Sequence, residues 1–220
     1  QTSIVSGIAY AAENCNEGTV TIYGNVTAGD VTFTAAENKP LTIIVANISA
    51  TEKSVLTVGT LTLVGATLDL YTTTGTGTPS NGYGTVTGTV AVSAADAVVG
   101  SVDADKATGF KMAAGSETTA EGTTNYAYLT GAIEGDVTVS AGTVTVGAAA
   151  DDVTLTVAAD STLTVASGAT LVLADEMTVE TATGAGAEDD AVLTVDGTIT
   201  VGEKVTLTIK GDAVVNGTMD

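Results

Sequence analysis

A short phrase in which apolar residues alternate with threonine recurs through the second half of the chain. It occurs at 137–139 (Val-Thr-Val), 143–146 (Thr-Val-Thr-Val), 155–157 and 163–165 (Leu-Thr-Val), 171–173 (Leu-Val-Leu), 177–179 (Met-Thr-Val), 193–195 (Leu-Thr-Val), 199–201 (Ile-Thr-Val) and 207–209 (Leu-Thr-Ile). The phrases are mostly about 6 to 8 residues apart, with longer steps across 147–152 and 182–190. Gly, Asp, Ala or Ser fills the gaps, so the spacing predicts short strands joined by tight turns.

The period-two alternation places Val, Leu and Ile on one face of each strand and Thr on the other. We therefore expect a common core formed by Val139, Val146, Leu155, Val157, Leu163, Val165, Leu171, Leu173, Val179, Leu193, Val195, Leu207 and Ile209. With 2 Phe and no Trp in the chain, that core must be thin. No segment shows a sustained helical period. The pattern predicts an all-β fold of stacked β-arches, a β-solenoid-like two-sheet architecture, with an antiparallel β-sandwich as the alternative.

Three regions follow one another without a disordered linker. Region 1–70 is an N-terminal β region with strands expected at 19–23, 30–35, 41–49, 54–58, 60–64 and 67–70. Region 71–135 is an irregular β elaboration or contact region, and region 136–220 is the regular β-arch repeat. We expect the three to form one continuous domain.

Composition excludes several function classes. The chain has no His, and all 6 of its cations are Lys, against 26 Asp plus Glu, for a net charge of −20. Without His or Arg the usual catalytic and phosphate-binding groups are missing, so we predict no enzyme activity and no cofactor. Residues 112–202 contain no cation, which disfavours nucleic acid as a partner. The longest apolar runs, such as 43–46, are too short for membrane insertion.

The chain begins at Gln1 rather than Met, which suggests a mature N-terminus left by removal of a targeting segment. We therefore expect an exported, extracellular protein at the cell surface. Its single cysteine, Cys15, has no partner in its own chain, so it is either a free thiol or an intersubunit disulfide. Its Asn and Glu neighbours favour an exposed loop before the first strand.

The remaining candidate sites are modification and cation sites. Asn25, Asn47 and Asn216 each begin an Asn-x-Ser/Thr sequence and are glycosylation candidates, Asn47 less so because it lies in an apolar run. Acidic turns occur at 103–105, 151–152 and 188–190. We expect these turns to be solvated, with divalent cations as an alternative, because none matches a complete calcium loop. We predict no specific metal site.

An arch stack ends in open sheet edges, which natural proteins protect with Pro, Lys, bulges or covering helices. Pro occurs only at Pro40 and Pro79, and Lys is scarce along the repeat. Either an unrecognised cap covers the edges or the chain pairs edge to edge with copies of itself. Homopolymerisation is the simpler expectation.

At the level of these residues, the chain resembles the cell-sheath proteins of filamentous methanogenic archaea. The resemblance rests on an acidic, Thr/Val/Gly/Ala-rich sequence with phrases such as 143–146 and 163–165, not on a diagnostic motif. It implies an extracellular structural protein that assembles into amyloid-like tubes of stacked β-arch hoops. Two alternatives remain, a cell-surface adhesin and an ice-binding Thr ladder. The second requires a constant rung length, which the varying spacing does not suggest.

Overall fold

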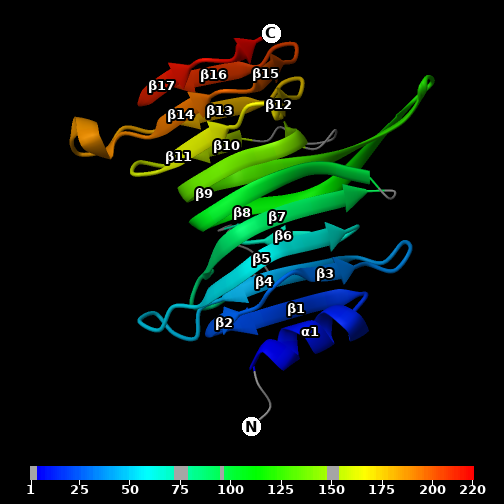
Figure 1. Cartoon of the computed structure of the whole chain (residues 1–220). Coiled ribbons are helices and arrows are strands. Elements are labelled where there is room, and N and C mark those ends of the chain that lie inside the picture. The colour runs from blue at the N-terminus through cyan, green and yellow to red at the C-terminus, as the bar shows by residue number, and fades with distance from the viewer. Residues whose placement is uncertain (1–3, 72–78, 95–96, 148–153) are drawn as a thin grey trace.

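The computed structural model describes residues 4–71, 79–94, 97–147 and 154–220 (Figure 1). It is 62% strand and 6% helix and forms a β-solenoid of about 6 turns. The solenoid prediction is therefore confirmed.

One helix begins the described chain and the strands follow in order. The helix is α1 (Ile4–Asn14). The strands are β1 (Gly18–Tyr23), β2 (Asn25–Thr27), β3 (Val31–Thr34), β4 (Leu41–Ala46), β5 (Val55–Val64), β6 (Thr67–Asp69), β7 (Thr85–Ala94), β8 (Ala97–Thr119), β9 (Gly122–Val146), β10 (Thr154–Val157), β11 (Thr162–Val165), β12 (Thr170–Leu173), β13 (Thr178–Thr181), β14 (Val192–Val195), β15 (Thr198–Val201), β16 (Thr206–Ile209), β17 (Asp212–Val215) and β18 (Thr218–Met219). A 3₁₀ turn, η1 (Ala187–Asp189), lies between β13 and β14.

The C-terminal half stacks three parallel faces. One face contains part of β9 followed by β10, β13 and β16. The second face contains the next part of β9, followed by β11, β14 and β17. The third face contains the last part of β9, followed by β12, β15 and β18. Each turn of the solenoid therefore has three strands here, one more than a two-sheet arch requires.

Two kinds of corner join these strands. Leu163 follows Leu155, and Leu171 follows Leu163, by eight positions. The fifth residue after the first leucine of each pair has positive φ, Asp160 (58°) and Gly168 (83°). Shorter six-residue corners have Gly instead, as at Gly197, where a Cβ would collide with the carbonyl oxygens of Ala166 and Ala169. Glycine is required there because the chain passes directly over the preceding turn.

The middle of the chain departs from this pattern. β8 runs antiparallel to β6, β7 and β9. β9 bends around two corners at Gly135 (φ 116°) and Gly142 (φ 67°), so one long strand spans all three faces. Region 71–135 thus supplies the reversal in strand direction between the two parallel halves.

The core is one continuous cluster from Ile8 to Ile199. Eleven of the thirteen predicted core residues are at most 2% exposed. Leu207 and Ile209 are the exceptions, because no other strand of the described residues covers β16 on its outer side: Leu207 is half-buried and Ile209 is 42% exposed.

Candidate assembly surfaces

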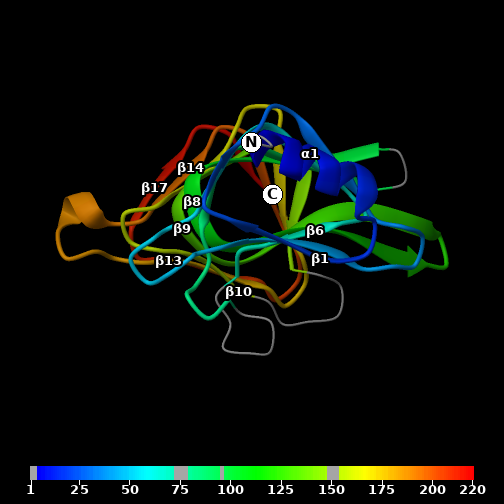
Figure 2. The same ribbon diagram turned by 90° about the horizontal axis from the view of Figure 1, so that it is seen from below.

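The N-terminal end of the solenoid is covered by α1, a helix that the sequence pattern did not predict (Figure 1, Figure 2). α1 packs on β2 and β3, and Ile8 points into the core with only 6% exposure. As a result the first-turn residues Ile22, Val26 and Phe33 are all buried. α1 is therefore a cap at this end, one of the two alternatives that the sequence allowed.

At the C-terminal end the described chain has no such cap. Four residues of this end lie in register with buried residues of the turn before, so their side chains face the interior of the solenoid. They are nevertheless exposed: Val201 38%, Ile209 42%, Val215 46% and Met219 42%. Val214, on the outer face of β17, is 47% exposed as well. The last turn therefore presents an apolar surface to solvent.

The backbone of the last turn is also open. β16, β17 and β18 each pair only with the preceding turn within the described chain. The N–H groups of Thr206, Asp212 and Thr218 donate to Met177, Ala191 and Gly197 at 3.0, 2.8 and 2.9 Å. Because successive residues of a strand direct their backbone groups to opposite sides, the alternate residues direct N–H and C=O away from the molecule. These residues are Leu207, Ile209, Ala213, Val215 and Met219.

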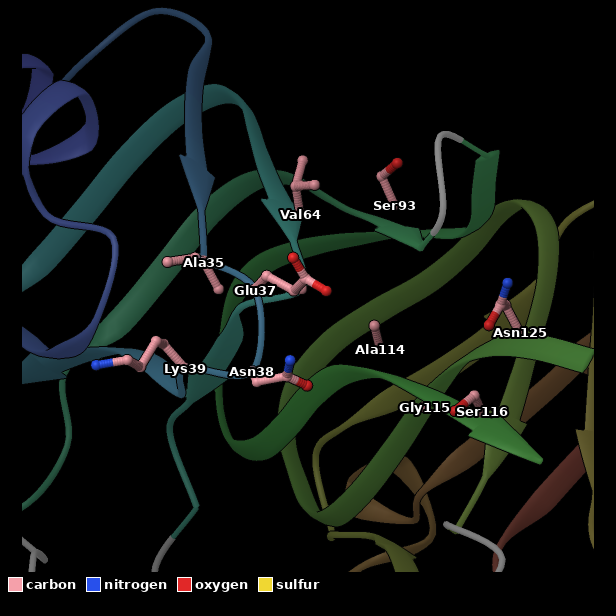
Figure 3. A pocket seen from close by; sticks show the side chains of 12 residues that line it. Ala35, Glu37, Asn38, Lys39, Val64, Ser93, Ala114, Gly115, Ser116 and Asn125 are labelled. Atoms are coloured by element: carbon pink, nitrogen blue, oxygen red, sulfur yellow. The ribbon is translucent and has the colours of Figure 1, made fainter. Parts of the chain in front are cut away.

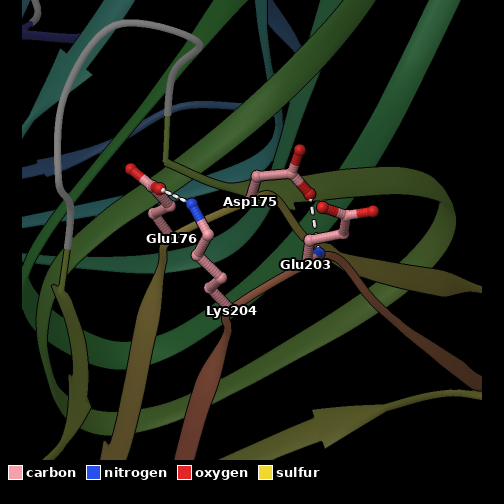
Figure 4. Close-up of polar contacts among 4 residues, drawn as sticks. All are labelled: Asp175, Glu176, Glu203 and Lys204. Carbon is pink, nitrogen blue, oxygen red and sulfur yellow. Dashed lines mark hydrogen bonds and ion pairs between the residues drawn. The ribbon is translucent and has the colours of Figure 1, made fainter.

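Charge is distributed unevenly between this end and the rest of the chain. Residues 201–220 contain two Lys and three carboxylates, a net of −1, whereas residues 1–200 contain four Lys and 23 carboxylates, a net of −19. At one corner Lys204 Nζ bonds Glu176 Oε1 of the turn below at 2.6 Å, and Glu203 N donates to Asp175 Oδ1 at 2.7 Å (Figure 4). The ion pair is exposed and contributes little stability.

The ends of β8 and β9 form an arm that projects from the solenoid (Figure 1). From Ala114↔Ala127 to Thr119↔Gly122 the two strands pair with each other, and no third strand of the described chain joins them. A groove of ≈ 480 Å³ lies between the base of this arm and the loop after β3 (Figure 3). Glu37 and Lys39 lie on one side of the groove, and Ser116 and Asn125 lie on the other.

Threonine stacks into columns on the outer faces. On the third face Thr143, Thr170, Thr198 and Thr218 lie in register through four turns. The neighbouring column is Thr145, Val172 and Thr200. The spacing between repeated phrases varies only through the lengths of the corners, and the strands themselves stay in register. The expectation that varying spacing would prevent a Thr ladder is therefore wrong for this face.

Cys15 follows α1 directly, and its N–H donates to Ala11 O at 2.8 Å. The thiol is free and half-buried. It therefore lies in the short segment between α1 and β1, before the first strand as expected but half-buried instead of fully exposed, and at the end of the solenoid opposite β16–β18.

The three asparagine candidates have different surroundings. Asn25 and Asn216 are exposed, and Asn216 Nδ2 donates to Asp196 Oδ1 at 2.8 Å. Asn47 is 4% exposed; its Nδ2 donates to Tyr83 O at 2.7 Å and Asn81 O at 3.2 Å, and its Oδ1 accepts from Ser54 N at 3.0 Å. A glycan on that nitrogen would replace these bonds, so the geometry favours a structural role for Asn47.

The acidic turns lack a converging ligand set within the described residues. Asp103 accepts a hydrogen bond from Thr89 and lines a shallow groove with Asp105. Asp189 and Asp190 accept from the backbone N–H groups of Gly186 and Gly184 at 3.2 and 2.8 Å, stabilising their own loop. The turn at 151–152 lies outside the described residues. No group of three or more Cys, Asp or Glu suited to a metal ion occurs in the described ranges.

Sequence reasoning missed the residues that define the open end. Ala213 and Val215 lie after the last of the repeated phrases, 207–209, and nothing in the sequence marks β17 as an edge strand. They differ from equivalent residues of inner turns only in their position, in the last turn of the described solenoid, which the three-dimensional structure reveals.

No known protein family, curated protein or solved structure matches the chain. Within the described residues, no helix has the length and apolar character needed to cross a membrane.

Proposed function

We propose that this protein is an extracellular structural protein that assembles with copies of itself through β-sheet edges into a cell sheath, surface layer or filament. The observation that carries the proposal is the last turn, where apolar core residues up to 46% exposed coincide with open strand edges. Open edges of this kind are templates for pairing with another chain.

Other features support the same role. A β-solenoid is a repeat architecture whose turns contact only their neighbours, which suits an extended structural element. The net charge of −20 keeps dispersed copies apart, and cations that screen this charge promote association. The resemblance to the sheath proteins of filamentous methanogens points in the same direction.

Negative-stain microscopy of the purified protein at rising salt tests the proposal. We expect dispersed particles at low ionic strength and tubes, hoops or fibres as the salt concentration increases. Particles that stay dispersed throughout the series contradict self-assembly and favour the adhesin alternative.

The column Thr143, Thr170, Thr198 and Thr218 favours one further candidate, ice binding. Strands stacked in a parallel sheet repeat about every 4.8 Å, so their hydroxyl groups form a regular array. Growth of ice crystals on a cold stage separates this function from assembly. Faceted crystals that disappear in Thr170→Lys, but persist in a Thr178→Lys variant on another face, support ice binding.

A further inference from the structure

We infer that the open C-terminal end, formed by β16, β17 and β18, binds the same end of a second copy, so that two solenoids join end to end about a two-fold axis. The inference rests on the proposed function, which it makes specific by naming the surface and the symmetry. Its first basis is the difference between the two ends of the molecule.

Only one end of the described solenoid is available without rearrangement. In the first turn Ile22, Val26 and Phe33 are 7%, 5% and 0% exposed under α1. In the last turn the corresponding inward positions Ile209 and Val215 are 42% and 46% exposed. Head-to-tail stacking would require α1 to leave its core contacts, whereas joining two C-terminal ends requires no such change.

The open edges suit a second copy. Leu207, Ile209, Ala213, Val215 and Met219 direct backbone N–H and C=O groups outward from three sides of one cross-section. A partner that pairs with all three strands and covers the apolar centre must have the same three-sided cross-section, which a second copy has. When the two copies are related by a two-fold axis perpendicular to the solenoid, the facing strands run antiparallel, a favourable arrangement for hydrogen bonding.

Charge also favours a second copy over a foreign partner. This end carries about half the negative charge per residue of the rest of the chain, −1 over 20 residues against −19 over 200, so it attracts a basic partner less strongly. For the same reason, two copies repel each other less through this end than the mean charge of the chain would give. Lys210 and Asp212 flank Gly211 at one corner, so each copy presents both signs of charge to the other.

Sedimentation velocity over a wide range of concentration, in moderate salt, tests the inference. The parent is the full chain with Cys15→Ser, which leaves only noncovalent association. We expect a monomer–dimer equilibrium that stops at two copies. Ala213→Pro removes an outward N–H while leaving the bonds of β17 to β14 in place. It should weaken the dimer by roughly tenfold or more, because symmetry doubles the loss.

Matched variants separate the surface from general effects. Thr21→Pro makes the corresponding change in β1 at the capped end, where Gly18 N donates to Pro40 O at 2.7 Å and Thr21 directs its N–H outward by the same alternation. It should leave the dimer unchanged. Lys210→Glu should weaken the dimer, and Lys53→Glu, with the same change of charge far from the last turn, should not. Circular dichroism confirms that each variant keeps its strands.

Each outcome decides between the two proposals. Association that is equally strong in Ala213→Pro, Thr21→Pro and the parent overturns the C-terminal interface but leaves self-assembly in place. Open-ended growth of the parent overturns the two-fold arrangement. Dimers of the parent that require Ala213, together with wild-type protein that forms no tubes or fibres at any salt concentration, support the interface and contradict the proposed sheath. A parent that stays monomeric overturns the interface.

Discussion

The buried hydroxyl of Thr181 accepts a hydrogen bond from the backbone N–H of Lys210 at 2.9 Å, linking two successive turns of the solenoid. The same oxygen accepts from Gly211 N at 3.1 Å. Thr181 is 0% exposed and occupies an inward position that Ile133, Val157 and Ile209 fill in the other turns of this face. A polar side chain in the core thus fixes the corner that leads into β17.

The first prediction follows from this contact. Thr181→Val keeps the shape of the side chain but leaves two backbone N–H groups without their acceptor, so we expect a loss of about 1–3 kcal/mol in the free energy of unfolding. Urea denaturation of the variant measures it. Thr164→Val, on the outer face of β11, is the control and should change little. Equal stabilities for both variants would show that the corner does not depend on Thr181.

The second prediction compares an inner turn with the last turn. Leu163 is 0% exposed, and Leu163→Ala should cost about 2–5 kcal/mol because it leaves a cavity. Leu207→Ala removes the same atoms from the half-buried last turn, where water fills the space, and should cost less than half as much in the monomer. Thermal or urea unfolding at low protein concentration measures both. A cost below about 0.5 kcal/mol for Leu163→Ala would place its side chain at the surface.

The strands of the repeat could be predicted because local pattern and burial agree. In 163–165 the alternation of Leu, Thr and Val matches a strand with one buried face, and Leu163 and Val165 are indeed buried. The corners were harder to predict. Glu176 and Lys204 both have positive φ, yet Glu and Lys do not mark a left-handed position in sequence.

α1 and the long strands could not be predicted for different reasons. The helix contains Gly7 and β-branched residues and is too short to form alone, so it depends on the packing of Ile8 against the first turn. Gly135 and Gly142 resemble strand-ending turns, but β9 continues through both as a bent strand. Whether Cys15, Asn25 and Asn216 are modified stays a prediction.

The third prediction concerns Cys15. Because its thiol lies next to α1, opposite the open end, a disulfide through it would link dimers by their capped ends. We expect disassembly to need reductant as well as denaturant, and Cys15→Ser to remove the need for reductant. Solubilisation assays on both proteins, with non-reducing electrophoresis, measure this. Identical behaviour without reductant would leave Cys15 as a simple thiol.

The fourth prediction concerns the cap. Ile8→Asp places a charge at a position that is 6% exposed and should release α1, which opens the first turn to pairing. With two open ends, the Cys15→Ser protein should grow into open-ended fibres instead of stopping at dimers. Light scattering and negative-stain microscopy measure the change. Tyr10→Asp, on the same helix at a position 68% exposed, is the control and should stay dimeric. If this control also formed fibres, the added charge and not the release of α1 would be the cause of growth.

Hydrogen exchange resolved by residue, measured by NMR on dispersed and associated Cys15→Ser protein, tests most directly whether copies pair through the last turn. The amides of Ala213 and Val215 should exchange rapidly in the dispersed protein, since they point away from β14, and become protected on association. The outward amides of Thr19 and Thr21 in β1 should exchange alike in both states. Unchanged exchange at Ala213 and Val215 in fully associated protein would contradict pairing through this edge.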